Sequence, residues 1–159
     1  MTSEAHVARR DAIASADREA KIVALAGVGL IGYGILFLIR NFTGFAELRL
    51  SAEQAGGTPK QIEGFSPNLY HYISHQQLAL SGFIIALGVA VITLALFGIR
   101  RGHCWALVPA FLAPVTALAI ALPLHYPWGF ATLGNLGLMY LDAVILLAGT
   151  VLSFRGMRD

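Results

Sequence analysis

The stretch that decides the fold is YHYISHQQLALSGFIIALGVAVITLALFGIRR, residues Tyr70–Arg101. From Leu78 to Ile99 it contains no charged residue over 22 positions, and roughly 20 consecutive apolar residues suffice for a helix to cross a bilayer. Two histidines precede this apolar run and two arginines follow it. The stretch therefore predicts a membrane-spanning helix.

The composition of the whole chain supports this prediction. Of its 159 residues, 57% are hydrophobic and 13% are charged, with a mean hydropathy of +0.68, which is too apolar for a soluble domain of this size. The eleven basic residues are spread among predicted helix ends, so no nucleic acid is expected as a partner. The single cysteine, Cys104, leaves no Cys-x-x-Cys pair, which excludes the four-helix membrane dithiol oxidoreductases.

Three further apolar runs predict three more spans. Within a membrane domain at 21–155, the four predicted spans cover about 22–39, 75–99, 104–124 and 136–154. Residues 1–20 are interpreted as a cytosolic N-terminal arm and residues 156–159 as a cytosolic tail. The sequence thus predicts an all-α fold, a bundle of four transmembrane helices.

A short helix is expected in the first extracytoplasmic loop. Thr58 precedes Pro59, and Gln61 lies three residues after the threonine. This spacing is typical of an N-cap, a first-turn proline and a capping-box partner. The pattern predicts a helix that ends near Gly64.

The basic residues predict the orientation of the spans. In a four-span arrangement, Arg40, Arg49 and Lys60 fall on one side. The other eight fall on the opposite side: Arg9, Arg10, Arg18, Lys21, Arg100, Arg101, Arg155 and Arg158. Because cytoplasmic loops are enriched in lysine and arginine, we expect a multi-pass protein of the cell (inner) membrane with both termini in the cytoplasm.

Small residues at helical spacing predict how the spans pack, because they let neighbouring helix backbones approach closely. The rows are Ala24, Gly27 and Gly34 in the first span; Ala79, Gly82, Ala86 and Ala90 in the second; and Ala106, Ala110, Ala113, Ala117 and Ala121 in the third. The second row continues from His71 and His75, and the third continues into His125. These histidines are therefore expected to point into the bundle.

A polar pocket is predicted toward the outward ends of the spans. Its candidate residues are His71, His75, His125, Asn135, Asp142 and Tyr33. Asp142 lies six residues inside the fourth span, roughly 9 Å at 1.5 Å per residue. A carboxylate at such a position is costly and suggests a function. Two interpretations are open: a bond to Tyr33 or Arg40 that holds the bundle together, or a proton relay or ligand contact.

The histidines also have two interpretations. They can be interfacial side chains bonded to loop carbonyls, or they can be ligands. As ligands, His75 and His125 would bind a haem, or together with His71 they would bind zinc or copper. No cofactor is predicted outright. Arg100, Arg101, Trp105 and Trp128 are predicted to lie at the lipid interface.

One set of short motifs resembles a known group of proteins. The segments are His75-Gln-Gln-Leu-Ala-Leu-Ser-Gly82, Arg100-Arg-Gly-His-Cys-Trp-Ala106 and His125-Tyr-Pro-Trp-Gly-Phe-Ala-Thr132. Over about residues 66–154 the chain resembles small four-span bacterial integral membrane proteins of uncharacterised activity. In that pattern a histidine is expected near Asn135, where this chain has an amide. The resemblance implies a helical bundle and no particular activity.

The leading functional expectation is a non-enzymatic accessory, scaffold or small-ligand-binding component of the membrane. Its partners would be the lipid bilayer and a membrane protein or a second copy of the chain. One alternative is a membrane redox, haem or metal-binding protein that uses the outward histidines. Another is a transporter-like or lipid-modifying protein that uses Asp142.

Overall fold

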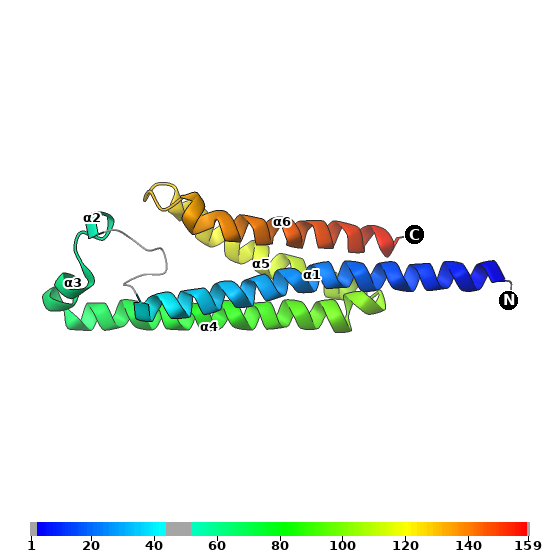
Figure 1. The fold of residues 1–159 in the computed structure, drawn as a ribbon, viewed down its shortest axis with the longest axis horizontal. Coiled ribbons are helices and arrows are strands. Elements are labelled where there is room, and N and C mark those ends of the chain that lie inside the picture. Colours follow the sequence, from blue (N-terminus) through cyan, green and yellow to red (C-terminus); the bar gives the residue numbers. More distant parts are fainter. Residues whose placement is uncertain (1–2, 44–51, 159) are drawn as a thin grey trace.

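The computed structural model describes residues 3–43 and 52–158 (Figure 1). Within them every regular element is a helix: α1 (Ser3–Thr43), α2 (Ala52–Ala55), α3 (Pro59–Phe65), α4 (Pro67–Phe97), η1 (Ile99–Arg101), α5 (Cys104–His125) and α6 (Leu133–Gly156). Four helical stretches are long and apolar enough to cross a membrane: Ala14–Thr43, Pro67–Arg101, Cys104–His125 and Leu133–Gly156. The predicted all-α fold with four such helices is confirmed.

Local sequence signals set the start of α3 and α4. The Thr58 hydroxyl accepts a hydrogen bond from the Gln61 backbone N–H at 3.3 Å, and the Gln61 side chain accepts one from the Thr58 N–H at 2.8 Å. This is the predicted capping box, with Pro59 at the first helical position. Ser66 caps α4 in the same way by accepting from Leu69 N–H at 3.3 Å. The short helix expected from the sequence is therefore present.

Helix α1 is the central element of the bundle. It packs against α4 along one side and against α6 along another, and both run antiparallel to it (Figure 1). Helix α5 contacts α4 and α6, and its buried residues lie in its first half: Ala106, Leu107, Ala110 and Pro114. The predicted arm and first span lie on one continuous helix, which extends beyond the other helices at its N-terminal end (Figure 1).

The seam between α1 and α4 consists of small residues that recur every seven positions. They are Ala20, Gly27, Gly34 and Asn41 in α1, and Ser74, Ser81, Gly88 and Ala95 in α4. A seven-residue step is close to two helical turns, so each set stays on one face. Because the helices are antiparallel, the first member of one set lies opposite the last member of the other.

Contacts at three positions along this seam show how closely α1 and α4 approach each other. A Cβ added at Gly88 would lie 2.5 Å from the Gly27 carbonyl oxygen, and one added at Gly34 would lie 2.9 Å from the Ser81 carbonyl oxygen. Asn41 Nδ2 donates to Ser74 Oγ at 2.9 Å. At the other end, Ala20 and Ala95 are fully buried in the same core cluster. The predicted packing role of Gly27 and Gly34 is confirmed.

The prediction for the second small-residue row is wrong. A Cβ added at Gly82 would meet no neighbouring atom within 4 Å, and Ala86 and Ala90 are exposed. The reason is that α4 turns its Ser81 and Gly88 face toward α1, which leaves the predicted row on the outer face. The third row is divided: Ala106 and Ala110 are buried, whereas Ala113, Ala117 and Ala121 are exposed.

Both termini lie at the same end of the bundle (Figure 1). Arg49, which entered the predicted charge count, lies outside the described residues, as do residues 1–2 of the predicted arm and residue 159 of the predicted tail.

Candidate functional site

The candidate site lies on the face of α6 that packs against α1. Asn135, Asp142, Gly149 and Gly156 recur every seven residues along this face. A Cβ added at Gly149 would lie 2.9 Å from the Val23 backbone nitrogen, so the two helix backbones approach closely there. Asp142 lies two turns further toward the start of α6, within the same seam.

The carboxyl group of Asp142 lies against the backbone of α1 at Gly29. A Cβ added at Gly29 would lie 2.8 Å from Asp142 Cγ and would overlap Oδ1. The carboxyl group therefore occupies the space that any larger residue at position 29 would fill. The residue is partly buried, and no hydrogen bond or ion pair joins its side chain to another described residue.

The predicted bond between Asp142 and Tyr33 is absent from the described part of the chain, and so is an ion pair with Arg40. Tyr33 is one turn beyond Gly29 along α1, and its hydroxyl lies 3.5 Å from the Asn135 backbone carbonyl instead. Asn135 in turn donates from Nδ2 to the Phe130 carbonyl at 3.1 Å. Tyr33 and Asn135 thus meet at one level, and Asp142 lies deeper along the same seam.

The three predicted pocket histidines do not join this group. His71 and His75 are exposed near the start of α4, so the expectation that they point into the bundle is wrong for the same reason as the Gly82 row. His125 Nδ1 lies 3.0 Å from the Ala121 carbonyl of its own helix. Among the side chains that the structure describes, which begin at residue 14, no three His, Cys, Asp or Glu groups are placed so that they could hold a metal ion. A haem bound by His75 and His125 stays a prediction.

Two features of the seams that α1 forms with α6 and with α4 were not predicted. Gly29 was not singled out, because its role follows only from the register between α1 and α6. The polar members of the α1–α4 seam were also missed: Ser81 is buried and donates to the Gln77 carbonyl at 2.7 Å, and Asn41 bonds Ser74. The seven-residue spacing of small residues in both helices was the signal that could have identified them.

The predicted lipid-interface residues lie near the ends of the helices. Arg100 Nε is 2.6 Å from Asp17 Oδ1, and Lys21 Nζ is 2.5 Å from Asp17 Oδ2. Arg101 lies over the Phe97 ring at 5.8 Å from its centroid. Trp105, at the start of α5, and Trp128, just after it, are both exposed.

Fold and site together define a class: a small helical bundle with four helices that could cross a membrane, and one carboxyl group, that of Asp142, within the predicted spans. This architecture is compatible with a multi-pass membrane protein. The chain matches no protein-family model, and comparisons with curated proteins and with solved structures found no match.

Proposed function

We propose that this protein is a non-enzymatic binding component of the cell membrane, and that Asp142 binds a cationic group. The group would belong to a small amphipathic ligand or to a transmembrane helix of a partner protein. The observation that carries the proposal is the position of Asp142 on Gly29, in the seam between two apolar helices, without a described hydrogen-bond or ion-pair partner.

The energetic argument rests on the cost of such a carboxyl group. Polar groups removed from water are normally paired, and an ionisable group in a transmembrane helix is rare unless it has a function. The hydroxyls of Thr150 and Ser153 on α6 are also buried without a partner, but an unpaired hydroxyl costs less than an unpaired charge. A cationic group that entered the seam would compensate Asp142.

The proposed orientation places both termini in the cytoplasm. Support comes from the excess of basic residues at the end of the bundle that carries the termini, in accordance with the positive-inside rule. The exposed Cys104 beside η1 provides a test, because it is the sole cysteine of the chain. A membrane-impermeant maleimide should label Cys104 in inside-out vesicles and leave it unlabelled in intact cells. Labelling from outside the cell would contradict this orientation.

The binding function is tested by affinity purification in a mild detergent. The tagged wild type, Asp142→Asn and Thr150→Val are compared for co-purifying proteins, by peptide mass spectrometry, and for bound amines, by extraction and mass analysis. Thr150→Val is the matched control because it removes another unpaired polar group from α6. We expect a stoichiometric ligand or partner in the wild type and in Thr150→Val, and its loss in Asp142→Asn. Equal recovery with all three proteins would refute the role of Asp142.

A further inference from the structure

Four elements meet at the end of the bundle that carries η1. Asp17 of α1 contacts Arg100 of η1, and Cys104 Sγ at the start of α5 lies 3.5 Å from Met157 Sδ, directly after α6. Gly156 of α6 packs against Glu19 of α1. We call this region the basic end. Its cationic residues are Arg18, Lys21, Arg100, Arg101, Arg155 and Arg158.

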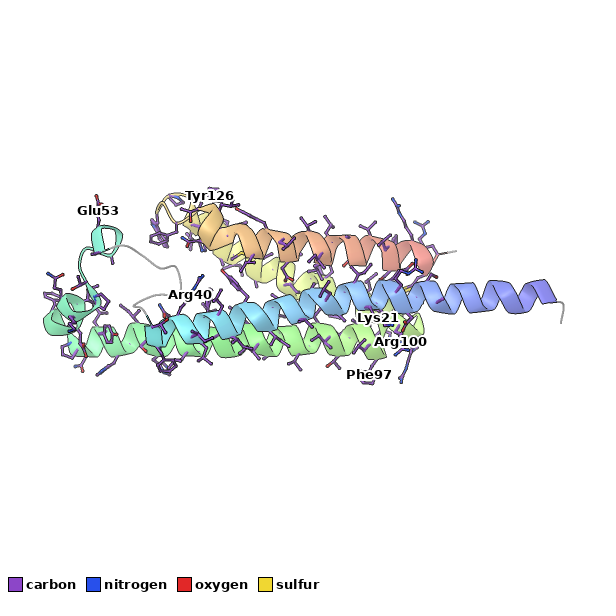
Figure 2. The ribbon with its side chains drawn as sticks, in the orientation of Figure 1. Lys21, Arg40, Glu53, Phe97, Arg100 and Tyr126 are labelled. Carbon is purple, nitrogen blue, oxygen red and sulfur yellow. The ribbon has the colours of Figure 1, made fainter. Side chains whose placement is uncertain are left out.

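The charges of the basic end are only partly compensated. Asp17 contacts both Lys21 and Arg100, so a single carboxylate is shared by two of these cations. Figure 2 shows Lys21 and Arg100 close together, with Phe97 beside them on α4. Arg101 and Arg158 have no carboxylate partner among the described residues. A positive excess therefore remains at this end.

Two arginines of the basic end each lie over the ring of a phenylalanine on the preceding helical turn. The Arg101 guanidinium lies 5.8 Å from the Phe97 ring centroid, and that of Arg158 lies 5.4 Å from the Phe154 centroid. Both phenylalanines are more than half exposed, Phe97 at 59% and Phe154 at 52%. Each pair thus combines an apolar ring that faces outward from a membrane helix with a cation at its rim.

We infer that the basic end binds the phosphate headgroups of anionic phospholipids, with Arg101 and Arg158 as the contacting residues. The rings would lie in the hydrocarbon beside the acyl chains, and the guanidinium groups at headgroup level. A guanidinium matches phosphate oxygens in two parallel hydrogen bonds, and stacking on a ring leaves its N–H edge available for them. The inference requires the membrane location and is independent of Asp142.

The test measures lipid retention by native mass spectrometry. The intact protein is reconstituted in nanodiscs of phosphatidylcholine mixed with phosphatidylglycerol and then released at low and at high salt. The wild type should retain phosphatidylglycerol in preference to phosphatidylcholine, and this preference should fall as salt rises, because exposed charges are screened. Equal retention of the two lipids, or a preference that salt does not change, would overturn the inference.

Matched variants locate the site. Arg101→Gln and Arg158→Gln should each weaken phosphatidylglycerol retention about threefold, and the double variant about tenfold. Lys60→Gln removes the same charge from α3, which lies at the other end of the bundle (Figure 1), and should leave retention unchanged. Circular dichroism in phosphatidylcholine nanodiscs checks that each variant is folded. A folded Arg101→Gln/Arg158→Gln protein with wild-type retention, or an equal loss in Lys60→Gln, would refute the assignment.

Discussion

Asp142 of α6 lies directly against Gly29 of α1: its carboxyl group occupies the space where a Cβ at position 29 would lie. The atom met there is the end of a short side chain. At Gly88, by contrast, the atom met is a backbone carbonyl oxygen. The two glycines should therefore respond differently to the same substitution.

Replacing Gly29 with alanine should move the carboxyl group at small energetic cost. The Asp142 side chain can rotate away, so we expect the free energy of unfolding in detergent to change by less than about 1 kcal/mol. Ligand or partner recovery should nevertheless fall, as in Asp142→Asn. Gly32→Ala is the control, because a Cβ at Gly32 meets no atom within 4 Å. Full recovery with Gly29→Ala would show that the carboxyl position is not important.

Replacing Gly88 with alanine should destabilise the bundle strongly. The added methyl group would meet the Gly27 carbonyl oxygen at 2.5 Å, and neither helix can yield without moving its backbone. We expect a loss of about 1–3 kcal/mol, which thermal unfolding would measure. The matched substitution Gly82→Ala, on the open face of the same helix, should be neutral or slightly stabilising. Equal effects at both positions would contradict the α1–α4 seam.

The hydrogen bond between Asn41 and Ser74 should contribute modestly to stability. Its length is 2.9 Å and both residues are partly buried, so a double-mutant cycle of Asn41→Ala and Ser74→Ala should give a coupling energy of about 0.5–1 kcal/mol. Additive effects of the two substitutions would show that the bond does not contribute.

Removing the carboxyl group of Asp142 should not weaken the fold. Because no described residue bonds the carboxyl group, Asp142→Ala removes an uncompensated polar group, and we expect the free energy of unfolding to stay constant or rise by about 1 kcal/mol. Such a result would show that the fold does not depend on the Asp142 carboxyl group, so that a loss of binding in Asp142 variants could not be attributed to unfolding. A loss of several kcal/mol would instead show that Asp142 is a structural residue.

The sequence predicted the helices well because their signals are local. Apolar length identified the four helices that are long enough to cross a membrane, and Thr58, Pro59 and Gln61 identified the start of α3. Packing faces were harder to predict. A row of small residues such as Gly82, Ala86 and Ala90 has the same local pattern whether a helix or lipid covers it, and only the register with α1 decides which face is buried.

The candidate site could be predicted in part. Asp142 stood out because a carboxylate in an apolar helix is costly. The residue of α1 that Asp142 contacts could not be predicted. Tyr33 and Gly29 lie one turn apart on α1, so a shift of α6 along α1 by one turn would place Asp142 against one or the other. His71, His75 and His125 were assigned to one pocket because they were predicted to lie at the same depth. Depth alone does not determine which way a side chain points around its helix.

The most direct test of the binding role is the chemical reactivity of Asp142. An apolar carbodiimide, which modifies carboxyl groups within membranes, is applied to native membranes and to the purified, ligand-free protein, and the peptide that contains Asp142 is analysed by mass spectrometry, with Asp142→Asn as the blank. We expect modification in the purified protein and protection in native membranes, where the cationic group occupies the seam. Equal modification in both preparations would contradict the proposed binding function.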